Sequence, residues 1–268
     1  MLHYPRLENF WAGKAFRLTL DSNVINFRKR LRTSSWARSA RDLFALAASI
    51  SDSPFTSICR NLTDLHIDKV IDVGANVGQF GLDMRRKGFR GLIISYEPVK
   101  ETFMKLNESI RYHQPWRSFQ LGLGSIESQV EINVSANDSL SSSILAMGQL
   151  HVETFPNSVT IRKEEIIIST IDLQIELLGL IPEELMLKLD VQGFEYEVLK
   201  GASKSLPRIP LCYLEVSLIP LYEGEQSLLP IMMELSKYGH EVIDVFRGVK
   251  SRNGQLLQVD ILTRRSNK

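Results

Sequence analysis

Residues 70–78 read Val-Ile-Asp-Val-Gly-Ala-Asn-Val-Gly, and most of the fold prediction starts from them. The apolar run at their start is bounded by Gly74, as in a buried strand of a parallel sheet. Gly74 and Gly78 lead into Gln79-Phe80, which predicts a strand, a turn and a helix, with glycines where a ligand approaches the backbone. A dinucleotide fingerprint needs G-x-G-x-x-G, but Asn76 stands at its second glycine. The pattern is instead D-x-G-x-x-x-G.

A cofactor without pyrophosphate suits this turn better, and we expect S-adenosylmethionine (SAM). Its ammonium and sulfonium charges favour nearby acceptors such as Asp72. A second apolar strand, residues 93–96, ends in Glu97, 25 residues after Asp72. An acid at about this offset binds ribose hydroxyls (about 20 residues in dinucleotide sites). The predicted cofactor-binding residues are Asp72, Gly74, Asn76, Gly78, Glu97 and Gly122, the last lying after a third predicted strand, where adenine is usually contacted.

Two of these cofactor residues also have a structural interpretation. Asp72 either contacts the cofactor or is an acceptor that ties down the glycine turn, and either role leaves it in the cofactor site. Asn76 either donates its amide to the cofactor's carboxylate or takes a left-handed turn conformation.

The composition is that of an ordinary globular protein of 268 residues, with 44% hydrophobic and 24% charged residues. We expect one domain plus an extension. The net charge of +1 gives no global argument for nucleic acid as a partner. Cys59 and Cys212 stand far apart, which favours reduced thiols over a disulfide framework. The sequence shows no membrane-spanning run and no hydrophobic signal region, so we expect a cytoplasmic protein.

Residues 1–55 differ from the rest of the chain. Six basic residues crowd between Asp21 and Asp42 without an acid among them, and apolar residues then recur at helical spacing. This predicts a basic, amphipathic helical extension. It is either a surface for an anionic partner, including peripheral contact with a membrane, or a helical flap with a solvated basic face.

Strands and helices alternate from about residue 56, so residues 56–268 are predicted to form one α/β domain. The alternation breaks at residues 125–168, which we expect to be an insertion near the ligand site. The predicted strands are 69–73, 92–96, 118–121, 130–134, 159–168, 185–190, 210–216, 241–246 and 256–262, and the predicted helices include 99–110, 194–200 and 228–238. The last two strands form an antiparallel hairpin. A mostly parallel sheet that ends in such a hairpin is typical of Rossmann-like class I methyltransferases.

Four stretches, in order, carry a resemblance to a known family. They are Asp72–Gly78, Tyr96-Glu97-Pro98, residues 188–201, and Glu215-Val216 followed by Leu221-Tyr222. Together they resemble the FkbM family of SAM-dependent methyltransferases. The resemblance implies SAM as cofactor and methylation of hydroxyl groups on sugars, glycans or secondary metabolites. The family usually has a glutamate where this chain has Gln192, which implies one negative charge fewer at that place.

The predicted catalytic residues are Asp190 and Lys188. Asp190 ends an apolar strand at the carboxyl edge of the sheet, where open α/β folds bind ligands, and is the leading candidate for a general base. Its structural alternative is a cap for the helix beginning near Phe194. Lys188 lies two residues earlier and so projects on the same face, where it contacts substrate or forms a structural ion pair.

Two further residues are candidates for contact with the substrate. Glu215 ends the next strand at the same edge, with a solvated strand end as its alternative. His151 lies in the insertion, and its alternative is a surface loop histidine. The five histidines form no i,i+3 or i,i+4 pair, and we expect no metal site. An oxygen-rich Mg²⁺ site formed by Asp190 and its neighbours stays open from the sequence.

The chain is thus predicted to be a SAM-dependent O-methyltransferase with a small-molecule or glycan acceptor. Two other functions stay open from the residues alone. One is an NAD-type oxidoreductase, disfavoured by Asn76. The other is a non-catalytic partner subunit that binds SAM or a nucleotide. We expect no nucleic-acid partner, since only the N-terminal arginines suggest one.

Overall fold

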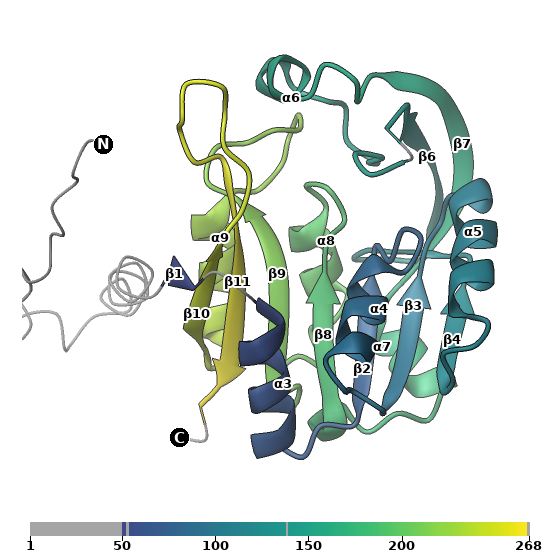
Figure 1. Ribbon diagram of the computed structural model, residues 1–268, viewed down its shortest axis with the longest axis vertical. Helices are drawn as coiled ribbons and strands as arrows, with labels where there is room; N and C mark the ends of the chain where they lie inside the picture. The colour runs from purple at the N-terminus through teal and green to yellow at the C-terminus, as the bar shows by residue number, and fades with distance from the viewer. Residues whose placement is uncertain (1–49, 52–53, 138, 267–268) are drawn as a thin grey trace, which may run out of the picture. The chain divides into compact units, whose positions relative to one another are not determined.

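The computed structural model describes residues 50–51, 54–137 and 139–266. Its main sheet has eight strands in the order β1-β10-β11-β9-β8-β2-β3-β4 (Figure 1). The strands are β1 (Ile50–Ser51), β2 (Lys69–Val73), β3 (Leu92–Tyr96), β4 (Trp116–Phe119), β8 (Leu185–Leu189), β9 (Leu211–Ser217), β10 (His240–Arg247) and β11 (Gln258–Arg265). Only β11 is antiparallel to its neighbours. The predicted mostly parallel sheet with a C-terminal antiparallel hairpin is confirmed.

The central strands are apolar because helices cover both of their faces. On one face pack α3 (Pro54–Asp64), α4 (Gln79–Arg86) and α5 (Lys100–Ile110), and on the other α7 (Ile171–Leu177), α8 (Glu195–Lys200) and α9 (Leu228–Lys237). All five residues of β8 are buried, and four of five are buried in β2 and in β3. Asp72 and Lys188 are thus charged residues buried within mostly apolar strands.

The segment predicted as an insertion contains most of a second, three-stranded sheet in the order β5-β7-β6. Its strands are β5 (Gly122–Leu123), β6 (Ser128–Ser135) and β7 (Thr160–Ser169), and α6 (Gln149–Thr154) lies between β6 and β7. In Figure 1, β6, β7 and α6 lie beyond the carboxyl ends of β2, β3 and β8. This is the sheet edge at which the sequence predicts the ligand site.

Several element boundaries differ from the prediction. β4 begins at Trp116, two residues before the predicted strand, because the Trp116 ring is buried and its Nε1 donates to Ser95 Oγ at 3.0 Å. The helix α7 was not predicted, although Thr170 marks its start by accepting from the Leu173 N–H. A short 3₁₀ turn (Pro182–Glu184) before β8 was also missed.

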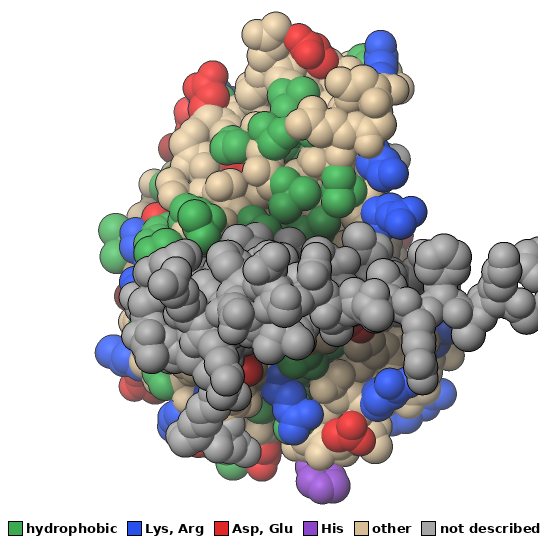
Figure 2. All heavy atoms as spheres, turned by 90° about the vertical axis from the view of Figure 1, so that its left-hand side faces the viewer, with side chains coloured by type: hydrophobic (Ala, Val, Ile, Leu, Met, Phe, Trp, Pro, Cys, Tyr) green, Lys and Arg blue, Asp and Glu red, His purple; other side chains and the backbone are tan. Residues whose placement is uncertain are grey.

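The predicted N-terminal extension lies almost wholly outside the described residues. Within the described part of the chain, no helix has the length and apolar character needed to cross a membrane. On the face shown in Figure 2, the acidic and basic side chains of the described residues are interspersed. The boundary near residue 55 and the limits of the insertion stay predictions.

Candidate active site

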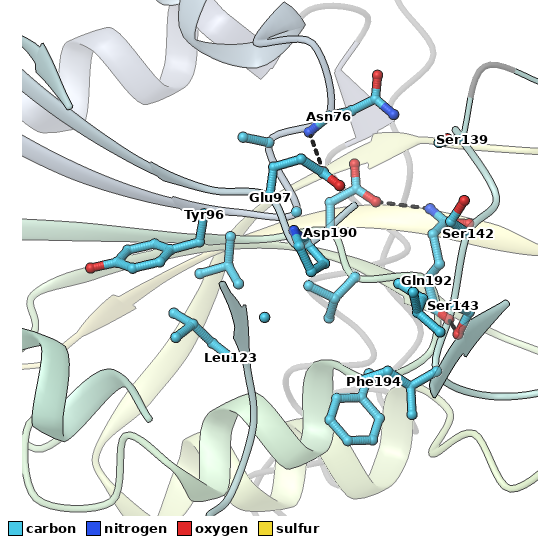
Figure 3. Close-up of a pocket in the computed structure, with 18 of the residues that line it drawn as sticks. Asn76, Tyr96, Glu97, Leu123, Ser139, Ser142, Ser143, Asp190, Gln192 and Phe194 are labelled. Carbon is cyan, nitrogen blue, oxygen red and sulfur yellow. Dashed lines mark hydrogen bonds between the residues drawn. The ribbon is translucent and has the colours of Figure 1, made fainter. Parts of the chain in front are cut away.

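A cavity of about 350 Å³ lies at the carboxyl edge of the main sheet, which is a size typical of small-molecule sites. The turns after β2, β3 and β8 form one side, and residues from the small sheet and the insertion form the other. Among its lining residues are Gly74, Asn76, Glu97, Gly122, Ser142, Ser143, Lys188, Asp190 and Gln192. Figure 3 shows Glu97 and Asp190 in this cavity, opposite the serines of the insertion.

The glycine turn after β2 is shaped by the chain itself. Gly74 has φ +71°, and a Cβ there would lie 1.8 Å from the carbonyl oxygen of Asp190. The turns after β2 and β8 therefore pack backbone against backbone, which only glycine allows. Asn76 takes the left-handed conformation (φ 48°), and its Oδ1 accepts from the Val77 N–H and from Gln79 Nε2. Gly78, at the start of α4, lies next to this turn but not on the cavity wall.

Glu97 follows β3 and is only 6% exposed. Its Oε2 accepts from the Asn76 N–H and its Oε1 from the Val99 N–H, both at 3.0 Å. Burial raises the pKa of Glu97 to about 7, against the lowering effect of these two hydrogen bonds. A carboxylate has about four acceptor sites, so two remain for hydroxyl donors in the cavity. This arrangement fits the ribose of SAM.

Asp72 and Lys188 form a buried ion pair beneath the cavity. Lys188 Nζ lies 2.9 Å from Asp72 Oδ1 and also donates to the carbonyls of Val73 and Gly74. Asp72 is fully buried, accepts from Ser95 Oγ and does not line the cavity. Its place corresponds to the structural interpretation, because through Lys188 it ties down the glycine turn.

Lys188 itself lines the cavity, but its ammonium group is committed to this structural role. Its burial lowers its pKa, yet the carboxylates of Asp72 and Asp190 outweigh that effect and raise the pKa overall. The raised pKa favours the charged ammonium form of Lys188. Its Nζ lies 3.8 Å from Asp190 Oδ2, so the two side chains do share a face of the strand end.

Asp190 follows β8 and presents a side chain that is 39% exposed at the cavity. Its Oδ1 accepts from Gln192 Nε2 at 2.8 Å. In the loop before α8, Glu195 Oε1 accepts from the N–H groups of Val191 and Gly193. The start of α8 at Phe194 has no side-chain cap, so Asp190 does not have the capping role considered for it, and its carboxylate faces the cavity.

Gln192 joins two carboxylates with one amide. Its Nε2 donates to Asp190 Oδ1 and, at 3.0 Å, to Glu215 Oε2, while its backbone carbonyl accepts from Ser143 Oγ. A glutamate at this position would supply neither donor. The departure from the family pattern therefore replaces a charge with two hydrogen bonds that hold neighbouring acids.

Glu215 is not a solvated strand end, because Gln192 and Gln258 both donate to its Oε2. Burial, together with the charges of Asp190 and Asp260, raises the pKa of Glu215 well above its usual range. Asp260 lies opposite Glu215 on β11, and burial raises its pKa to about 6. Neither Glu215 nor Asp260 lines the cavity.

His151 is a buried residue, not the surface loop histidine considered above, since it is only 1% exposed. The α6 helix turns its ring against Tyr222, and the ring centroids lie 4.8 Å apart. His151 does not line the cavity, so it has no direct contact there. Gly122 does line it, and a Cβ at Gly122 would lie 2.5 Å from Ile168 Cδ1.

Sequence reasoning missed Asp260 and the role of Tyr222. Asp260 comes to the site only through the antiparallel pairing of β11 with β9. Tyr222 reaches Gln192 across 30 residues of sequence. Among the described residues, no group of three or more His, Cys, Asp or Glu side chains is arranged to hold a metal ion.

The chain matches the family model of the methyltransferase FkbM domain over residues 72–242, well over half of its length. The chain therefore belongs to the FkbM methyltransferase family. It is a SAM-dependent methyltransferase with a Rossmann-like class I fold.

Solved structures with a similar fold share little sequence with the chain. One is TehB from Haemophilus influenzae, with 10% identity and a TM-score of 0.40, where the match covers 79% of this chain and 62% of TehB. Another is the magnesium protoporphyrin IX methyltransferase ChlM from Synechocystis PCC 6803 with bound SAM, with 11% identity and a TM-score of 0.41, where the match covers 93% of this chain and 100% of ChlM. A third is fibrillarin from Aeropyrum pernix with natively bound SAM, with 14% identity and a TM-score of 0.37, where the match covers 73% of this chain and 66% of fibrillarin. The chain spans less than two thirds of the TehB and fibrillarin chains. No curated protein matches the sequence.

Proposed function

We propose that this methyltransferase transfers its methyl group to a hydroxyl of a saccharide, glycan or secondary metabolite. The observation that supports this most directly is the Asp190 carboxylate on the wall of the cavity that Glu97 also lines. A hydroxyl group is almost fully protonated at neutral pH and gains from a base as it attacks. Bound SAM supplies the electrophilic methyl group, and Asp190 receives the hydroxyl proton.

In this proposal, the residues around the cavity have separate roles. Glu97 and the turn at Gly74 hold the cofactor, whereas the charged Lys188 keeps that turn in place. The insertion contributes the hydroxyl side chains of Ser139 and Ser142 to the opposite wall, where polyol acceptors have hydrogen-bonding partners. Positioning of the acceptor between these walls supplies much of the rate enhancement.

The test is methyl transfer from SAM to a panel of neutral monosaccharides, oligosaccharides and polyol natural products, followed by mass spectrometry of the product. We expect S-adenosylhomocysteine to form only with a hydroxyl-bearing acceptor, and the product to be a methyl ether. Transfer only to amines or carboxylates would contradict hydroxyl methylation. Tight SAM binding without turnover on any acceptor would favour the non-catalytic partner subunit. No observation favours an NAD-type oxidoreductase.

A further inference from the structure

A chain of hydrogen bonds leads away from Asp190 into the insertion. Gln192 Oε1 lies 2.8 Å from Tyr222 Oη, and Tyr222 Oη lies 3.1 Å from His151 Nε2. His151 Nδ1 in turn lies 3.2 Å from Ser158 Oγ. Tyr222, His151 and Ser158 are all buried, with exposed fractions of 2% or less. A polar chain so deeply buried is costly unless each member has its partner.

The Gln192 amide is oriented by its neighbours. The carboxyl groups of Asp190 and Glu215 lie on its nitrogen side, so Nε2 faces them and Oε1 faces Tyr222, whose hydroxyl donates to it at 2.8 Å. Tyr222 Oη also lies 3.3 Å from the carbonyl oxygen of Ser141 and 3.1 Å from His151 Nε2. Beyond the ring, Ser158 Oγ donates to the Phe155 carbonyl at 2.6 Å and lies 3.2 Å from His151 Nδ1. Burial lowers the pKa of His151, which favours a neutral ring.

We propose that Tyr222 and His151 are positioning residues for methyl transfer, which act through the Gln192 amide to hold the Asp190 carboxylate toward the cavity. This inference rests on the proposed function of Asp190 as the base. The chain begins in the insertion, at His151 and Ser158, and ends on the carboxylates of Asp190 and Glu215. Neither Tyr222 nor His151 lines the cavity, so each reaches Asp190 through Gln192, although Tyr222 Oη also lies 3.3 Å from the carbonyl oxygen of Ser141 in the insertion.

The inference separates cofactor binding from turnover. The hydrogen bonds of Glu97 are to Asn76 and Val99, and none of them passes through Gln192 or Tyr222. Loss of the Tyr222 hydroxyl leaves Gln192 Oε1 without its donor and frees the amide to rotate. The Asp190 carboxylate then loses its fixed orientation, and small misplacements of a reacting group cost about 100-fold in rate.

The experiment compares Tyr222→Phe with Tyr196→Phe, which removes a hydroxyl on α8 whose contact with Glu234 is 3.5 Å long. NMR follows the side-chain amide of Gln192, assigned from the signal missing in Gln192→Leu. In Tyr222→Phe we expect faster solvent exchange of this amide, a roughly 10- to 100-fold lower kcat and an unchanged Kd for SAM. Tyr196→Phe should match the parent in all three. His151→Gln, which keeps a hydrogen-bonding group toward Tyr222, should retain more activity than His151→Leu.

Two results would overturn the inference. One is a Gln192 amide that exchanges at the parent rate in Tyr222→Phe. The other is an unchanged kcat despite a loosened amide. Failure of the proposed function is distinguishable from both, because the parent protein itself would then methylate no hydroxyl in the panel. Melting temperatures of all variants show whether any loss of activity is a loss of fold.

Discussion

At the scale of single residues, Glu97 is the most informative side chain of the cofactor site. It is a buried carboxyl group whose pKa is raised to about 7 by burial. Two ribose hydroxyls can donate to its ionised form, whereas a protonated carboxyl group offers fewer acceptor sites. SAM affinity should therefore rise as the pH rises through 7.

This predicts a dissociation constant for SAM that is about tenfold higher at pH 6 than on the plateau above pH 8. The direction follows because protonation of Glu97 must be reversed before the ribose binds. In Glu97→Gln the affinity should be weaker throughout and flat over this range. Calorimetric titration of both proteins with SAM from pH 6 to 8.5 measures the dissociation constant at each pH. An equally steep pH dependence in Glu97→Gln would mean that another group causes it.

Gly74 and Gly88 offer a matched pair for testing the backbone contact in the glycine turn. Both have positive φ (+71° and +99°), but a Cβ at Gly74 meets the Asp190 carbonyl, whereas one at Gly88 meets nothing within 4 Å. Gly88→Ala should lower the free energy of unfolding by about 1 kcal/mol from conformational strain alone. Gly74→Ala should cost roughly 3 kcal/mol because a clash is added. Urea unfolding of both variants gives the two losses in the free energy of unfolding. Equal losses would argue against close packing of Gly74 on the Asp190 carbonyl.

The roles of single residues were only partly readable from the sequence. Glu97 was recognisable as a candidate because it follows Asp72 by 25 residues. That distance is set by the length of one strand–helix–strand unit. Asp72 was predicted at the cofactor, but it is the fourth of five strand residues, Val73 follows it before the turn, and it does not line the cavity. Tyr222 belongs to a stretch that carries the family resemblance, but its role gave no signal, because its partners His151 and Gln192 lie 71 and 30 residues away.

At the scale of elements, one ion pair links two neighbouring strands. Asp72 on β2 is register-paired with Lys188 on β8, and their side chains meet at 2.9 Å inside the sheet. Removing one partner of a buried pair leaves an uncompensated charge, which is strongly destabilising.

Lys188→Met should therefore lower the free energy of unfolding by about 3–5 kcal/mol. The double variant Asp72→Asn with Lys188→Met should recover much of that loss, because no buried charge is then left alone. A double-mutant cycle of urea unfolding gives the coupling between the two residues. Additive losses would mean that the two side chains do not interact.

The elements themselves were predictable to different degrees. β2, β3 and β8 match the prediction closely because buried parallel strands appear as short apolar runs with sharp polar or glycine ends. β5 and α6 were missed because two and six residues carry no usable periodicity. These short elements depend on tertiary contacts, such as the pairing of β5 with β7, and sequence windows do not contain those contacts.

At the scale of the whole molecule, the strand order explains why the site lies where it does. β8 is flanked by β2 and β9, so the residues that follow these three strands share one sheet edge. The small sheet lies beyond that edge and supplies the opposite wall of the cavity. Sequence alternation predicted the main sheet, but the second sheet could not be assembled without knowing that β5 pairs with β7.

The most direct test of the account is the Asp190→Asn variant, compared with the parent in SAM binding by calorimetry and in turnover on the acceptor that the panel identifies. The substitution keeps the shape of the side chain and removes its ability to receive a proton. We predict a Kd for SAM within about threefold of the parent and a loss of kcat of about 100- to 10,000-fold. Turnover at the parent rate, with binding intact, would contradict the assignment of Asp190 as the base.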